Sequence, residues 1–145
     1  MEKVLSFLQN LPEYEALLKA LRASKTAAVT GIGQINRSHL IAALSRDMGR
    51  PMVLICQDDI AAKRLQEELR AFLGTEVPSL PTRELTLYDS SAVSRSWEQK
   101  RLRQLYDLRR GAVPLQIMTW EALSLRTVPP EVLENAAFSL EVGKT

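Results

Sequence analysis

Residues Thr26–Leu44 (TAAVTGIGQINRSHLIAAL) restrict the possible folds more than any other stretch of the chain. A short β-prone run leads into a glycine-rich turn, and a helical pattern of apolar residues begins near Asn36. A strand, a glycine turn and a helix in this order frame a phosphate-binding loop, because backbone N–H groups and a helix N-terminus converge there on an anion. The stretch therefore predicts an α/β domain with the strand-turn-helix unit found in nucleotide-binding proteins.

The loop keeps the length of the G-x-x-x-x-G-K-[ST] pattern but not its chemistry. Asn36 stands at the second glycine, where close backbone approach is needed, and Arg37 replaces the compact lysine ammonium with a broader guanidinium. Ser38 keeps the position that faces a magnesium ion in a working loop. We predict a degenerate phosphate loop that does not support ATP hydrolysis, while weak anion binding at the helix N-terminus stays open. Its positions are Gly31, Gly33, Asn36, Arg37 and Ser38.

Composition narrows the class of protein further. The 145 residues, 46% of them hydrophobic, suit a single globular domain with a real core. No apolar run approaches the ~20 residues that cross a bilayer, and the N-terminal stretch does not read as a signal peptide. A single cysteine and a single histidine exclude an internal disulfide and a Cys/His zinc site, so we expect a cytoplasmic protein and no metal site. The net charge of +2 means that any nucleic-acid footprint must be local.

Hydrophobic patterning predicts strands that alternate with helices. The expected strands are 25–30, 51–56, 77–80, 113–119 and 138–142, and the expected helices are 12–21, 36–48, 58–73, 96–110, 120–125 and 129–135. This alternation implies βαβ units and a mostly parallel sheet. We expect the strand at 51–56 to be covered on both faces because it is apolar throughout.

Several side chains have expected roles in this scheme. Asp58 or Asp59 should cap the third helix, Gly74 should end it, and Ser96 with Gln99 should form a capping box for the next. The inward side chains of that helix are expected to be Leu102, Leu105 and Tyr106, and the expected packing residues elsewhere are Cys56, Trp97 and Trp120.

The helix after Ser96 carries a high density of cations. Such a density could follow a phosphate backbone, but the charges are spread around the helix, which favours a solvated surface. The candidates for nucleic-acid contact are Arg95, Lys100, Arg101 and Arg103. No pattern in the chain pairs a nucleophile with a base, so we predict no catalytic residue.

Several stretches together resemble the N-terminal region of the bacterial transcription-repair coupling factor family (Mfd). Beside the loop and PMVLICQDDIAAKRLQEELRAFL, the family's P-x-x-E-x-x-x-Y-D-x-x-x-x-S spacing is kept, and TWEAL at 119–123 matches its Thr-Pro…Glu-Ala-Leu segment with Trp120 in place of proline. The spaced positions are Pro81, Glu84, Tyr88, Asp89 and Ser94. The resemblance runs from about Tyr14 to the end of the chain.

The resemblance implies a fold and a function. It implies a RecA-like, P-loop NTPase-type three-layer α/β/α domain, similar to the first domain of the helicase UvrB, that has lost its ATP site. Residues 1–24 would be N-terminal helices, 25–136 the UvrB-like domain with the degenerate loop, and 137–145 the start of a linker or a further domain. The sheet is expected to be incomplete because the chain resembles only a first piece of the family's proteins.

The resemblance also implies partners for a longer protein. That protein would be an ATP-dependent DNA translocase that displaces stalled RNA polymerase and recruits UvrA for nucleotide excision repair. ATP, magnesium, DNA, RNA polymerase and UvrA would be bound by its other domains, and this chain would bind no cofactor and no membrane. An uncovered sheet edge would leave the chain a monomer or a weakly self-associating dimer. Two alternatives stay open, an active ATP-binding domain and a nucleic-acid-binding module that uses the helix at 95–110.

Overall fold

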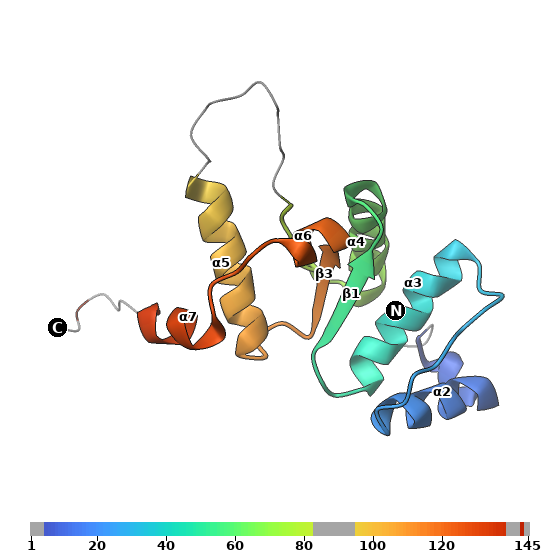
Figure 1. Cartoon of the computed structure of the whole chain (residues 1–145). Coiled ribbons are helices and arrows are strands. Elements are labelled where there is room, and N and C mark those ends of the chain that lie inside the picture. Colours follow the sequence, from blue (N-terminus) through green and yellow to red (C-terminus); the bar gives the residue numbers. More distant parts are fainter. Residues whose placement is uncertain (1–4, 83–94, 139–142, 144–145) are drawn as a thin grey trace.

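The chain folds into an α/β arrangement with helices on both faces of a small sheet (Figure 1). This computed structural model describes residues 5–82, 95–138 and 143. The elements in chain order are η1 (Leu8–Asn10), α2 (Pro12–Arg22), α3 (Gln34–Asp47), β1 (Met52–Cys56), α4 (Asp59–Leu73), β2 (Ser79–Leu80), α5 (Arg95–Arg109), β3 (Leu115–Thr119), α6 (Trp120–Ser124) and α7 (Pro130–Ala136).

The sheet has three strands in the order β1-β3-β2, and both pairings are parallel. From β1 the chain passes through α4 to β2, at the far edge of the sheet. It then returns through α5 to β3, the central strand. Because crossovers between parallel strands are right-handed, this reversal of direction puts α4 and α5 on opposite faces of the sheet. Figure 1 shows that arrangement, with α4 on one side of the strands and α5 on the other. The predicted α/β class and parallel sheet are confirmed, and the layers are consistent with an α/β/α fold.

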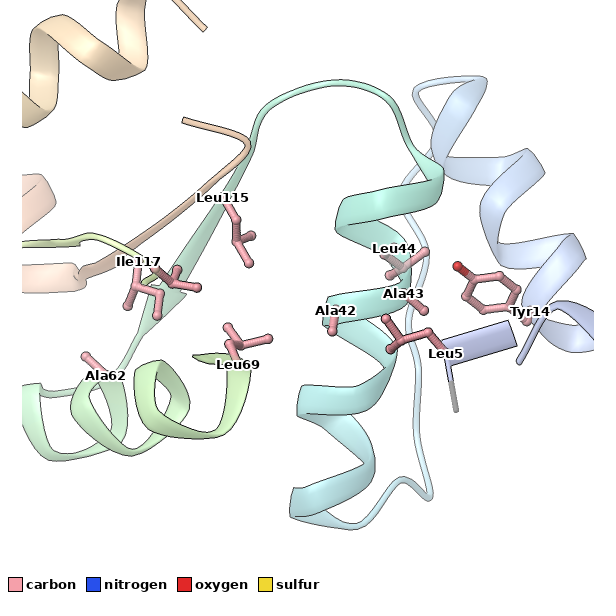
Figure 2. Packing of buried hydrophobic residues seen from close by; sticks show 10 residues of the cluster. Leu5, Tyr14, Ala42, Ala43, Leu44, Ala62, Leu69, Leu115 and Ile117 are labelled. Atoms are coloured by element: carbon pink, nitrogen blue, oxygen red, sulfur yellow. The ribbon is translucent and has the colours of Figure 1, made fainter. Parts of the chain in front are cut away.

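The main core joins one face of the sheet to the N-terminal helices. Leu69 on α4 is fully buried and lies toward Leu115 and Ile117 of β3 (Figure 2). Ala42 and Ala43 are also fully buried, and their small side chains leave room for α3 to pack against α4. A second, smaller cluster on the opposite face holds α5 and α6 to the strands.

The ends of α4 follow the local rules that the sequence indicated. The Asp58 side chain accepts a hydrogen bond of 2.7 Å from the backbone N–H of Ala61, so Asp58 is the N-cap. Gly74 ends the helix in a left-handed conformation with φ of +71°, and its N–H donates to the Arg70 carbonyl. Both predictions are confirmed.

A polar cluster fastens the N-terminal helices to the end of α3. The hydroxyl of Tyr14 donates a 2.7 Å hydrogen bond to the Asp47 carboxylate, which also accepts from the Gln9 amide and the Arg46 guanidinium. Burial alone would raise the pKa of Asp47, but the three hydrogen bonds outweigh it and hold this pKa below its usual value. Burial and the same carboxylate raise the pKa of Tyr14.

The predicted strand at 25–30 is wrong. These residues form no strand, and all of them are exposed. Residues 27–30 lie instead beside α2 and Leu40 of α3, with which they line a pocket. The three strands that the structure describes pair only with one another, so β1 is an edge strand. Val53 and Ile55, on one face of β1, are 45% and 52% exposed, so the expectation that β1 is covered on both faces is wrong.

The buried side of α5 also differs from the prediction. Leu105 packs inward as expected, but Leu102 is partly exposed and Arg101 is buried in its place. Trp120 is 63% exposed, so it is not a packing residue, and Ser96 lies inside α5, which begins at Arg95.

Two other predictions lie outside the described residues. They are the positions from Glu84 to Ser94 of the family spacing and most of the strand at 138–142. Within the described parts of the chain, no helix has both the length and the apolar character that crossing a membrane requires.

Candidate functional site

At the predicted phosphate loop, the glycine turn is present but the strand expected before it is not. Gly31 has φ of +76°, a backbone conformation that favours glycine, and Gly33 is the N-cap of α3. The helix starts at once, since the Arg37 N–H donates a 3.0 Å hydrogen bond to the Gly33 carbonyl. A turn that leads into a helix N-terminus is therefore present, but residues 25–30 before it are exposed and lie outside the sheet.

Ser38 lies away from the loop that it was predicted to serve. It is 1% exposed, and its hydroxyl donates a hydrogen bond to a carboxylate oxygen of Glu68 on α4. Glu68 also accepts a 3.1 Å hydrogen bond from Arg64, one turn earlier on the same helix. A magnesium ion bound with a phosphate group would need this hydroxyl at the mouth of the loop. Here the hydroxyl belongs to the interface between α3 and α4.

The other loop residues lie in a shallow and mostly apolar surface. Asn36 and Arg37 are exposed, and Arg37 and Gly31 line one cavity of about 420 Å³. The rest of its lining is Val29, Thr30, Ile32, Leu40 and Ile41. The structure thus brings Gly31 and Arg37 together and separates them from Ser38, so one cation remains where a phosphate loop has several donors.

The basic helix divides into buried and exposed cations. Arg101 is 5% exposed and donates hydrogen bonds to the carbonyls of Ala122 (2.9 Å) and Pro81 (3.3 Å). Its guanidinium also lies 5.9 Å from the ring centre of Trp97, and burial lowers its pKa. Arg101 therefore joins α5 to α6 and to the end of β2, and it is not presented to a ligand at the surface.

Two of the remaining predicted cations are exposed on α5. Lys100 is exposed, and Arg103 is exposed but forms a 2.9 Å ion pair with Asp107 one turn later. That hydrogen bond raises the pKa of the Arg103 guanidinium. Arg95 is the first residue of α5. Among the described side chains of these four predicted contacts, those of Lys100 and Arg103 are therefore exposed.

A polar chain at the carboxyl edge of the sheet was missed by the sequence reasoning. The Thr82 hydroxyl lies 3.1 Å from an Asp59 carboxylate oxygen and 2.9 Å from the Thr119 hydroxyl. The Trp97 indole N–H donates to the Thr82 carbonyl, and Thr119 caps α6 by accepting from the Ala122 N–H. The signal was available, because parallel strands end at the same edge and Thr119, Thr82 and Asp59 each follow or end a strand.

The described residues contain no group of three or more His, Cys, Asp and Glu side chains that could hold a metal ion. Cys56 lies half-buried at the end of β1, where burial and the nearby Asp58 raise the pKa of its thiol. A thiol with a raised pKa is a poor nucleophile and metal ligand at neutral pH.

The fold defines a class: an α/β domain with a small parallel sheet and a glycine turn that leads into the N-terminus of α3. Two curated relatives are similar to the chain, and both are named transcription-repair-coupling factor. The protein from Myxococcus xanthus is 27% identical over 139 residues, which are 90% of this chain. The protein from Bacillus subtilis (strain 168) is 21% identical over 145 residues, or 99% of this chain. These findings confirm the resemblance to the coupling factors.

The chain spans about 12% of the length of each of these relatives. No family model and no solved structure matches it.

Proposed function

We propose that this chain is a non-catalytic, UvrB-like module of a transcription-repair coupling factor, with a RecA-like fold whose phosphate loop serves as structure. The observation that supports the proposal most directly is the hydrogen bond between the buried Ser38 hydroxyl and the Glu68 carboxylate. Ser38 keeps the Ser/Thr of the pattern, while Asn36 and Arg37 replace its second glycine and its lysine. In the longer protein, ATP hydrolysis with magnesium and contact with DNA, RNA polymerase and UvrA would be carried out by other domains.

The two alternative functions have less support. An active ATP-binding domain would need the Ser38 hydroxyl and a lysine at one phosphate site, and neither is present there. A nucleic-acid-binding module would need several free cations on one surface, whereas Arg101 is buried and Arg103 is paired with Asp107.

Isothermal titration with ATP and magnesium tests the non-catalytic proposal. The chain and its back-substituted variant, Asn36→Gly with Arg37→Lys, are both expected to give no binding up to about 1 mM nucleotide. Micromolar binding and turnover by the unmodified chain would overturn the proposal. Binding by the back-substituted variant alone would show that the two substitutions caused the loss and that the position of Ser38 did not.

A chimera tests the role in repair. The matching region of the Bacillus subtilis relative is replaced by this chain, and removal of lesions from the transcribed DNA strand is compared with that in cells that carry the unaltered protein. We expect strand-specific repair to be retained. Loss of repair in a chimera that folds and accumulates normally would contradict the assignment.

A further inference from the structure

A groove between α5 and α7 combines an apolar floor with a cationic rim. Its volume is about 730 Å³. The floor contains Leu102, Leu133, Ala136 and Phe138, and the rim contains Arg103 and Arg110. Figure 1 shows α7 beside the end of α5 that leads to β3, away from the phosphate-loop remnant.

Among the described residues, nothing covers the floor of the groove. Phe138 is 80% exposed and Leu102 is 37% exposed, and α7 buries none of its residues. An ion pair of 2.8 Å between Arg109 and Glu134 holds α7 on α5. Large apolar side chains that gather on an exposed surface mark a place where another molecule binds.

The rim supplies a positive charge that has no counter-charge within the described parts of the chain. Arg103 is neutralised by Asp107, but none of the ion pairs among the described residues includes Arg110. Arg110 is held in place instead by the ring of Tyr106, whose centre lies 5.6 Å away, and by a 2.8 Å hydrogen bond to the Tyr106 hydroxyl. A positioned guanidinium beside an apolar floor is complementary to a carboxylate next to an apolar side chain.

We propose that this groove binds an acidic amphipathic helix of a partner protein. The apolar stripe of that helix would cover Leu102, Leu133 and Phe138, and a carboxylate at the edge of the stripe would pair with Arg110. This is the helix-in-groove mode of recognition, in which side chains at helical spacing enter an apolar channel. A nucleic acid fits the groove less well, because the floor is largely aliphatic and Arg110 is a single cation, whereas a phosphate backbone is bound by several cations in a row.

The probe is a fluorescein-labelled synthetic peptide with leucines at helical spacing on one face and glutamates elsewhere. Its binding to the whole chain is followed by fluorescence anisotropy, and we expect a Kd of about 10–100 μM. Phe138→Ser is expected to weaken binding about tenfold, since it removes an aromatic side chain that the partner buries. Arg110→Glu is expected to weaken it about fivefold.

Two matched controls report on nonspecific effects. Phe7→Ser removes a phenylalanine of comparable exposure, 70% against 80% for Phe138, that lies in the N-terminal segment. Lys100→Glu reverses an exposed charge on α5 that does not line the groove. Both controls are expected to leave the Kd unchanged.

Four results would overturn the proposal. The first is the absence of binding, and the second is equal binding of a peptide with lysines in place of the glutamates. The third is tighter binding of a labelled single-stranded DNA that Lys100→Glu weakens, which would make α5 a nucleic-acid surface. The fourth is a dimer in sedimentation that Phe138→Ser dissociates, which would make the groove a contact between two copies of this chain.

Discussion

Replacing Arg101 with methionine distinguishes a structural cation from a ligand-binding one. The variant Arg101→Met keeps much of the side-chain volume but removes both carbonyl hydrogen bonds and the contact with the Trp97 ring. A buried carbonyl left without its donor costs about 1–3 kcal/mol, and the cation–π contact contributes about 0.5–1 kcal/mol. Part of this loss is offset because the guanidinium no longer has to be buried. We therefore expect the free energy of unfolding to fall by about 2–3 kcal/mol.

Urea denaturation followed by circular dichroism measures this change. With an m-value of about 2 kcal/mol/M, the midpoint should fall by about 1–1.5 M at constant m. The matched control is Lys100→Met, which alters the exposed neighbour and should change the free energy of unfolding by less than about 0.5 kcal/mol. Equal midpoints for the two variants would refute the structural role of Arg101. A stable Arg101→Met variant with weakened DNA binding would support the nucleic-acid alternative instead.

Three further predictions concern the N-terminal polar cluster and α4. Because the folded-state pKa of Asp47 is lowered, its carboxylate stabilises the fold above the unfolded-state pKa of about 3.9. That stabilisation starts to fall below about pH 4 and is lost as the pH passes the lower, folded-state pKa. In acid-titration melts, the stability difference between the chain and Asp47→Asn should therefore shrink steadily as the pH falls below about 4, and a difference that stays constant would contradict this prediction. Leu69→Ala should destabilise by about 3–5 kcal/mol in urea, since Leu69 is fully buried between α4 and β3, and a loss below about 1 kcal/mol would place it outside the core. Gly74→Ala should cost about 1 kcal/mol in the same assay through backbone strain alone, because no heavy atom lies within 4 Å of an added Cβ, and no change would argue against the left-handed cap.

Sequence patterns within one or two helical turns predicted the elements whose formation depends mainly on neighbouring residues. The helix at α4 combines an Asp58 cap, an apolar stripe and a terminal glycine, and each of these acts within one or two turns of its neighbours. The strand β3 is buried along its full length, and it was predicted nearly to its boundaries. These parts of the fold follow from short-range physical chemistry.

The errors fall where structure depends on a distant partner. Residues 25–30 have the β-propensity of a strand, but residues 27–30 lie beside α2 and α3 and do not pair with the open edge of β1. In α5, the helical period allows either Leu102 or Arg101 to face inward. The acceptors at Pro81 and Ala122 favour Arg101, and both come from other elements of the fold.

The candidate site shows the same division. The substitutions at Asn36 and Arg37 could be read directly from the sequence, and they predicted a degenerate loop. The burial of Ser38 could not be read in this way, because its partner Glu68 lies 30 residues later on another helix. The helix period does place Ser38 on the face that contains Ala42, but only the packing of α3 on α4 shows that this face meets Glu68.

A double-mutant cycle on Ser38 and Glu68 tests most directly the claim that the loop serine is structural. The free energy of unfolding is measured in urea for the chain, Ser38→Ala, Glu68→Ala and the double variant, so that the effect of Glu68 on Arg64 cancels. A buried hydrogen bond to a charged group predicts a coupling energy of about 1.5–3 kcal/mol. A coupling energy within about 0.3 kcal/mol of zero would contradict the account and leave the Ser38 hydroxyl available to a metal-bound nucleotide.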